Sequence, residues 1–268
     1  DYAVVIDPCI AFPVIDYLEM EILQLFAILI THHHSDHTGG IAELQKLSTV
    51  PVYGPCNEAI AEVTHPVREN DQIDVPQLPL RLTVMDIPGH TRGHIAYFGT
   101  DPFALVFCGD TLFSCGCGRI FEGSAQQMYQ SLQKLAQLPE DTHIYCTHEY
   151  TLSNIRFARA VDPENRKLIE LEITAQQLRQ QNIPTLPTPL FLEKAVNPFL
   201  RCDQQALIES ALPHYRVLNA QEIVSEIQNQ PSSDYVLASH FQLNFTQQTV
   251  DGKLFLLINQ ATHDSVIS

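Results

Sequence analysis

Histidine and aspartate side chains at the ends of apolar runs form the strongest chemical signal in this sequence. The stretch 31–37 reads THHHSDH, with His32 and His34 at alternate positions. Alternate side chains point the same way only where the backbone is extended, which would direct His32 and His34 toward one ion. Asp36 and His37 would then need a turn of the chain to reach an adjacent ion. Imidazole and carboxylate ligands together suit zinc, iron or manganese. The pattern therefore predicts two adjacent groups of metal ligands on one loop.

A histidine cluster can also be a polar loop or the remnant of an affinity tag. A tag would be terminal and uninterrupted, whereas this cluster lies inside the chain and includes an aspartate. Further fragments favour a metal site, because each places a candidate ligand just beyond an apolar run: PGHT with His90, CGDT with Asp110 and CTHEY with His148. One histidine at a strand end is usually a core or surface residue, but four such fragments in one chain predict a shared site.

Short apolar runs alternate with helical stretches in the first half of the chain, and these elements must position the ligands. We expect strands at 3–6, 27–30, 50–53, 80–87, 95–98, 104–108 and 144–146, and helices at 14–25, 39–47 and 128–138. Strands and helices interleaved in this way predict a layered α/β architecture.

After about residue 150 the sequence becomes helical in character. We expect helices at 154–161, 164–181, 204–212 and 221–229, with the prolines of 184–189 forming an extended connection. We therefore place a domain boundary near Tyr150. This gives a catalytic domain at 1–150 and a smaller helical, substrate-binding domain at 151–268 that ends in an atypical tail.

The composition is that of a globular protein with an acidic balance. Of 268 residues 45% are hydrophobic, and the formal net charge is −16. A nucleic-acid binder needs a basic face, and the longest apolar run, 22–30, is far too short to cross a membrane. An anionic substrate would need a local patch of positive charge, part of which bound metal ions would supply. We therefore expect a soluble monomer that binds neither nucleic acid nor membranes.

Seven scattered cysteines do not predict a disulfide framework and indicate a reducing compartment, so we expect a cytoplasmic protein. Cys115 and Cys117 have the C-x-C spacing of some metal sites. No second thiol pair or paired histidine lies nearby to complete a structural zinc site, which makes that interpretation the weaker one.

The pattern H-x-H-x-D-H, followed by a later His, Asp and His, resembles the metallo-β-lactamase superfamily. The resemblance implies a four-layered αβ/βα sandwich and two divalent metal ions, zinc above all, with iron or manganese as alternatives. It assigns ligands to each ion: His32, His34 and His90 to the first, Asp36, His37 and His148 to the second, and Asp110 as the bridge between them. His33 and His94 do not match ligand positions, and we expect them to hydrogen bond or pack.

Longer segments resemble one branch of that superfamily, the glyoxalase II or hydroxyacylglutathione hydrolase family. They are FCGDTLF at 107–113, GCGRIFEG at 116–123, HEYTLSN at 148–154 and NPFLR at 197–201, within a match from residue 5 to about 201. That family carries a C-terminal helical domain and hydrolyses S-D-lactoylglutathione to glutathione and D-lactate in methylglyoxal detoxification. The resemblance implies a thioesterase in which a metal-bridging hydroxide, oriented by Asp36, attacks the thioester carbonyl.

The same resemblance implies residues that contact the glutathione part of the substrate. Arg119 matches a basic position and Tyr150 matches a tyrosine, while Phe121 stands where some members have Tyr, so that hydroxyl contact is absent. Arg119 could instead be a solvated loop charge, and Tyr150 could pack between the domains. The binding role of Arg119 is favoured because a guanidinium pairs well with a carboxylate.

Both ends of the chain depart from the family pattern. Members of the family begin with strands ahead of the segment 3–8, whereas this chain starts in that segment. We interpret the chain as trimmed, and the lost part could include a targeting segment. Loss of those strands would expose a sheet edge. Members end in a basic segment, whereas 241–268 predicts a strand pair, 243–249 and 254–258, with Lys253 as its only Lys or Arg. Either substrate binding is weakened or this tail is foreign to the family fold.

Two other functions stay open at this point. A mononuclear iron persulfide dioxygenase shares the sandwich and the first motif, although the helical second domain and the segment 116–123 argue against it. The alternative is a folded metal-binding domain without useful turnover, caused by the two altered ends.

Overall fold

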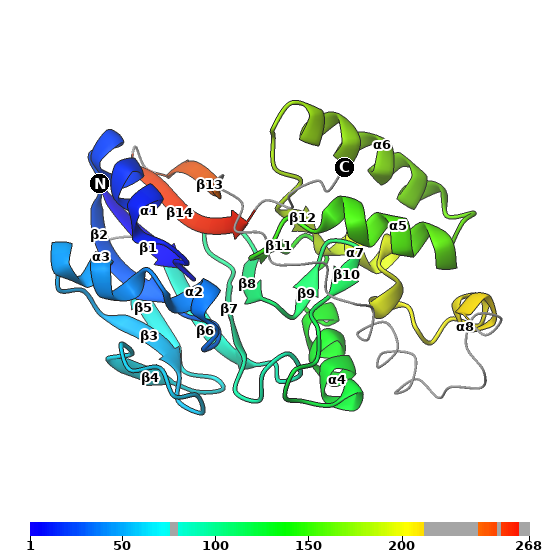
Figure 1. The fold of residues 1–268 in the computed structure, drawn as a ribbon, viewed down its shortest axis with the longest axis horizontal. Helices are drawn as coiled ribbons and strands as arrows, with labels where there is room; N and C mark the ends of the chain where they lie inside the picture. The colour runs from blue at the N-terminus through cyan, green and yellow to red at the C-terminus, as the bar shows by residue number, and fades with distance from the viewer. Residues whose placement is uncertain (76–79, 212–240, 251–252, 263–268) are drawn as a thin grey trace.

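Two six-stranded β-sheets form the centre of the molecule, and helices cover their outer faces (Figure 1). The computed structural model describes residues 1–75, 80–211, 241–250 and 253–262. The first sheet has the order β13-β14-β1-β2-β3-β4 and the second has the order β12-β11-β8-β7-β6-β5.

The strands of the first sheet are β1 (Tyr2–Ile6), β2 (Gln24–Leu29), β3 (Val52–Pro55), β4 (His65–Val67), β13 (Phe241–Val250) and β14 (Lys253–Thr262). Those of the second are β5 (Gln72–Val75), β6 (Leu80–Asp86), β7 (Ile95–Gly99), β8 (Leu105–Gly109), β11 (His143–Cys146) and β12 (Thr188–Pro189). A separate hairpin consists of β9 (Leu112–Phe113) and β10 (Gly116–Cys117). The helices are α1 (Ala11–Met20), α2 (Ser35–Thr38), α3 (Ile41–Leu47), α4 (Ala125–Ala136), α5 (Thr151–Val161), α6 (Arg166–Gln180), α7 (Leu190–Val196) and α8 (Gln205–Ala211), with a 3-10 turn η1 (Pro198–Leu200).

Strand β1 shows how the sequence builds the layers. Its residues alternate between the two faces of the sheet, as the period of a strand requires. Val4 and Ile6 lie in the core between the two sheets. Ala3 and Val5 lie in the core beneath α1 and α3. The continuous apolar run is therefore a strand buried on both faces.

The second sheet is covered on its outer face by α4. This helix begins at a capping box in which the side chains of Ser124 and Gln127 each accept a hydrogen bond from the other residue's backbone N–H. Met128, Leu132 and Leu135 form its buried stripe and pack on the sheet. The layered α/β sandwich that the sequence predicts is confirmed.

The helices that follow residue 150 pack on one another beside the sandwich. Ile155 and Ala158 of α5, Leu168 and Ala175 of α6, and Val196 of α7 share a separate buried cluster. Figure 1 shows α5 and α6 side by side, away from α1 and α3. Among the described residues, no helix has the length and apolar character that crossing a bilayer requires.

The largest difference from the predicted elements lies at the first helix. The sequence predicts a helix at 14–25, but α1 ends at Met20 and the chain turns at Ile22, which has a φ of 55°. Strand β2 then begins at Gln24, and Leu23 and Leu25 are buried beneath the helices. A short apolar run fits helical and strand periods equally well, so the sheet decides between them.

Several smaller differences are of the same kind. Among the described residues, the structure has five strands that the sequence does not predict, β4, β5, β9, β10 and β12, and two helices, α2 and α7. The helix predicted at 221–229 lies outside the described residues.

The strand pair predicted in the tail is present as β13 and β14, which pair antiparallel. Strand β14 also pairs in parallel with β1, where Ala3 lies opposite Leu256. The tail therefore covers the edge of β1 that the sequence predicts to be exposed.

Candidate metal centre

Loops at the carboxyl ends of four strands bring the predicted ligands together. Strands β6 and β8 are both antiparallel to β7, and β11 is parallel to β8, so β6, β8 and β11 run in one direction. Their carboxyl ends lead to His90, Asp110 and His148, while β2 leads to the histidine cluster and α2.

In the described part of the chain, ligand-capable atoms form three groups, in each of which all atoms lie within 4.8 Å of one another: His32, His34 and His90; His32, His37 and Asp110; and Asp36, His37 and His148. All seven predicted ligands belong to at least one of these groups. Among the described residues no such group includes a cysteine, and His33 and His94 also lie outside them.

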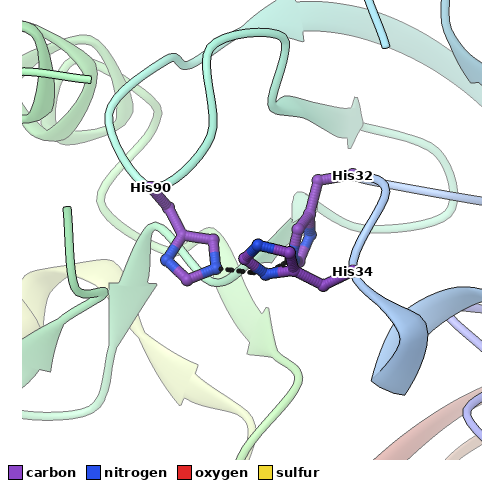
Figure 2. A group of neighbouring side chains, drawn as sticks. All are labelled: His32, His34 and His90. Carbon is purple, nitrogen blue, oxygen red and sulfur yellow. Dashed lines mark hydrogen bonds between the residues drawn. The ribbon is translucent and has the colours of Figure 1, made fainter. Parts of the chain in front are cut away.

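Imidazole nitrogens converge in the first group (Figure 2). His34 Nδ1 lies 3.1 Å from His32 Nε2 and 3.0 Å from His90 Nε2. Nitrogen atoms this close, each facing the other two, surround a point at which all three can donate a lone pair to one ion. His34 reaches that point from the start of α2, where the backbone is still extended at φ −61° and ψ 146°.

Hydrogen bonds on the far side of two of these rings fix the nitrogen that faces the site. Thr31 donates its hydroxyl proton to Asp7 Oδ2 at 2.7 Å, so it accepts from His32 Nδ1 at 3.0 Å. His90 Nδ1 donates to the Arg119 carbonyl at 2.7 Å. In both rings the proton is therefore on Nδ1 and the lone pair on Nε2 faces the site.

Asp110 lies between the first and the second group. Its Oδ2 atom is 3.5 Å from His90 Nε2 and 3.3 Å from His148 Nε2, while Oδ1 is 3.4 Å from His37 Nε2. Asp36 completes the second group, with Oδ2 3.6 Å from His148 Nε2. A carboxylate that faces ligands of both groups has the position of a bridge.

The electrostatics of this pocket favour positive charge. Although burial opposes it, Asp110 and Asp7 raise the pKa of His37 well above its ordinary value. Burial likewise opposes the shift at Asp110, but His148 and His37 hold the pKa of that carboxyl well below its usual range. Asp7 Oδ2 is 3.1 Å from His37 Nδ1, and both side chains are fully buried.

The histidines of the first group are held neutral. Burial is the largest cause of the lowered pKa of His32, His34 and His90. The pKa of His32 lies well below its ordinary value. A neutral imidazole is the form that binds a metal ion.

The residues present fit a pair of divalent cations. Asp110 Oδ1 and His37 Nε2 are buried and make no hydrogen bond to a described residue. Buried polar atoms that make no hydrogen bond are costly, and a coordinated ion satisfies them. The mixed imidazole and carboxylate donor set is one that zinc, iron and manganese all accept.

The predicted substrate-binding residues lie around the ligands. Phe121 is exposed, and its ring centroid lies 5.2 Å from that of His90 and 5.5 Å from that of His34. The ring of Tyr150 stacks on that of His148 at 5.1 Å. The Arg119 side chain is exposed, and its carbonyl is the acceptor for His90. Each of the three therefore adjoins a ligand by its ring or its backbone.

The structure adds supporting residues that the sequence reasoning missed. Asp7 follows β1 just as the ligands follow their strands, which is a signal that could have found it. Glu58 accepts from His33 at 2.9 Å and from the Gly93 backbone at 3.1 Å, so it joins two ligand loops. His94, which the sequence predicts to hydrogen bond or pack, does both: it packs against His32 and accepts the backbone N–H of Asp110 at 3.1 Å.

Comparisons with known proteins agree with this geometry. The metallo-β-lactamase superfamily profile matches residues 1–148, and the profile of the hydroxyacylglutathione hydrolase C-terminus matches 149–230. The chain is 59% identical over 213 residues to a hydroxyacylglutathione hydrolase of Nitrosomonas eutropha, covering 80% of this chain and 82% of the relative. The chain belongs to the hydroxyacylglutathione hydrolase family.

A second relative and one solved structure give further matches. A hydroxyacylglutathione hydrolase of Shewanella baltica is 52% identical over 219 residues, covering 80% of this chain and 82% of the relative. The crystal structure of the BLEG-1 B3 metallo-β-lactamase superposes with a TM-score of 0.56 at 22% identity, covering 74% of this chain and 88% of that one. That likeness shows the shared fold.

Proposed function

We propose that this protein is a metal-dependent thioesterase that hydrolyses S-D-lactoylglutathione to glutathione and D-lactate. One observation carries the proposal: seven ligand-capable side chains converge at one site in a chain that is 59% identical to a hydroxyacylglutathione hydrolase. The four strands that end at this site hold its groups on rigid elements, which catalysis requires.

Two divalent metal ions fit the ligand groups, with zinc as the first choice and iron or manganese as chemical equivalents. When bound, such ions supply an activated water at neutral pH and stabilise negative charge on a carbonyl oxygen. His32, His34 and His90 would hold one ion, Asp36, His37 and His148 the other, with Asp110 shared.

Asp36 differs from the other carboxylate ligand because its side chain is 41% exposed, whereas that of Asp110 is 9% exposed. Its carboxylate faces both the ligand pocket and the solvent from the first turn of α2. We assign Asp36 the role of orienting the attacking water, because its carboxylate has a second oxygen, Oδ1, besides the Oδ2 atom that faces His148.

The substrate is expected to lie over Phe121 and Tyr150. The ring of Phe121 offers an apolar surface beside the first ligand group, and Tyr150 lies beside the second. Arg119 extends from the same segment as Phe121 and supplies a cation for a glutathione carboxylate. The thiolate needs no strong acid to leave, so a general acid beside the sulfur is not required.

We also propose the organisation in which this reaction takes place. A catalytic domain at 1–150 and a substrate-binding domain from 151 are supported by the two family profiles, which meet between residues 148 and 149. The free cysteines among the described residues support a reducing, cytoplasmic setting, and a monomer is the simplest assembly of a site built from one chain.

The deciding experiment measures thioester cleavage and metal content on the same sample. Release of glutathione from S-D-lactoylglutathione, with about two equivalents of metal per chain, is expected. Oxygen uptake with glutathione persulfide, without thioester cleavage, would instead identify a persulfide dioxygenase. Two metal equivalents with neither activity would identify a metal-binding domain without turnover.

A further inference from the structure

The β9–β10 hairpin lies between the metal ligands and the helices that follow residue 150. It begins two residues after Asp110 and leads directly into Gly118 and Arg119. Its turn contains Cys115, whose φ of 56° is uncommon for a residue other than glycine. Strands of two residues cannot hold such a turn by themselves, so other groups must fix it.

Three polar side chains from the helical segments hold this turn. Asn197 donates from Nδ2 to the carbonyls of Phe113 at 3.0 Å and Gly116 at 2.9 Å. Glu193 accepts the Cys115 backbone N–H at 2.9 Å. Asn154 donates to the Ser114 carbonyl at 2.9 Å. The backbone of every residue from 113 to 116 is thereby bound by a helical side chain.

Asn197 and Glu193 also bind each other, with Nδ2 3.1 Å from Oε2, and both residues are fully buried. Asn197 Oδ1 accepts the Phe199 backbone N–H at 3.0 Å, which fixes the orientation of its amide. Buried polar groups that bind one another favour a single arrangement of the chain around them. Here the contacts run through Glu193 Oε2, while Glu193 Oε1 makes no hydrogen bond to a described residue.

The far side of the hairpin touches the site at several points. The ring of Phe113 meets that of His148 at a centroid distance of 6.0 Å and that of Tyr150 at 5.4 Å. Gly118, the residue after β10, lies against the carbonyl of Asp110. The carbonyl of the following residue, Arg119, accepts a hydrogen bond from His90 Nδ1. A shift of the hairpin would therefore move ligands of both groups.

We propose that Asn197 is a positioning residue which, with Glu193 and Asn154, holds the β9–β10 hairpin and through it the metal ligands and Arg119. The role in substrate binding rests on the proposed thioesterase, whereas the role in holding metal does not. The helical segment then contributes to the metal centre without supplying a ligand.

The test compares Asn197→Ala with a matched control, Asn165→Ala. Asn165 caps α6. It donates to the Asp162 carboxylate and the Ala195 carbonyl at 2.9 Å each and accepts from the Leu168 backbone N–H, and none of these bonds reaches the hairpin. Both variants lose hydrogen bonds within the helical segment. Thermal stability, retention of zinc against a chelator and the kinetics of lactoylglutathione hydrolysis are measured for each.

We expect Asn197→Ala to lose zinc about tenfold faster and to lower kcat/KM about tenfold, with part of that change in KM. Asn165→Ala is expected to lower the melting temperature while both functional readouts stay within about twofold of wild type. Equal losses of zinc retention in the two variants, or unchanged retention in Asn197→Ala, would overturn the proposal.

Variants of Asn154 and Glu193 decide the matter where Asn197→Ala does not fold. Asn154 is partly buried like Asn165, and Asn154→Ala removes one hydrogen bond to the hairpin, so faster zinc loss than in Asn165→Ala supports the proposal and equal loss refutes it. Glu193→Gln keeps a carbonyl oxygen that can accept from Cys115, so it should retain zinc, whereas Glu193→Ala should not. A wild type that holds zinc but does not cleave lactoylglutathione refutes the proposed function, while zinc retention still tests the hairpin.

Discussion

Gly118 has no room for a side chain, and the substitution Gly118→Ala tests how far the site tolerates displacement. An added Cβ would lie 1.7 Å from the carbonyl oxygen of Asp110 and 2.9 Å from its carbonyl carbon. Both are backbone atoms, so the two segments must separate by about 1.3 Å before the closest contact reaches 3.0 Å. Movement of one segment displaces Asp110, and movement of the other breaks the bond from His90 Nδ1 to the Arg119 carbonyl.

Either displacement is large on the scale of metal coordination. Ligand distances must be kept within about 0.2 Å, and a misplacement of about 1 Å at a catalytic site costs about a hundredfold in rate. We therefore expect Gly118→Ala to lower kcat/KM about a hundredfold, equivalent to about 2.7 kcal/mol of transition-state stabilisation, and to lower the metal content.

The control for this variant is Gly99→Ala, at the end of β7 that lies away from the site. Its added Cβ would lie 3.1 Å from the Arg81 carbonyl and 3.1 Å from Leu82 Cδ2, a tight contact that a small shift relieves. Steady-state kinetics and metal analysis are measured for both variants. Gly118→Ala with wild-type metal content and wild-type kcat/KM would show that Asp110 and His90 do not need their observed positions.

Three further predictions concern single side chains. Asp110→Ala should abolish turnover and lower metal content, because it removes the carboxylate that faces both groups; full activity with one equivalent of metal would contradict a two-metal site. Arg119→Ala should raise KM for lactoylglutathione more than for a small thioester without glutathione, and equal effects would remove Arg119 from the substrate site. Burial raises the pKa of Glu193 above its ordinary 4.5, against opposing hydrogen bonds from Cys115 and Asn197, so the folded state holds this proton to higher pH than the unfolded chain. The free energy of unfolding should therefore fall as pH rises above about 4.5, and Glu193→Gln should remove that part of the decline in denaturant titrations across the pH range.

The sequence predicts which side chains converge because each of them has a local signal. His90, Asp110 and His148 follow apolar runs, and β6, β8 and β11 run in one direction, so their carboxyl ends meet at one edge. The alternation of His32 and His34 is likewise visible in the sequence, since it depends only on an extended backbone. The layered fold follows from the same runs, because a strand buried on both faces is apolar throughout.

The supporting groups could not be predicted, because their roles depend on contacts between distant parts of the chain. Glu58 lies 35 residues from Gly93, whose backbone it binds, and Asn197 lies 84 residues from Phe113. Neither side chain has a local feature that predicts its distant partner, although Asn197 lies in the segment NPFLR that resembles the family. The same limit explains the first helix, where only the pairing of β2 with β1 decides that 24–29 is a strand.

The acidic balance of the chain and an anionic substrate are compatible because the two act on different length scales. At physiological ionic strength charges farther apart than about 8 Å are largely screened, so most of the net charge of −16 is not felt at the site. The substrate meets only the charged groups near the site. There Asp7 and Asp110 both form ion pairs with His37, and Arg119 is exposed in the same segment as Phe121. Bound divalent ions would add positive charge at the same place. The net charge of the sequence therefore argues against a nucleic-acid partner, which needs an extended basic face, without arguing against glutathione, which needs only a few cations at one point.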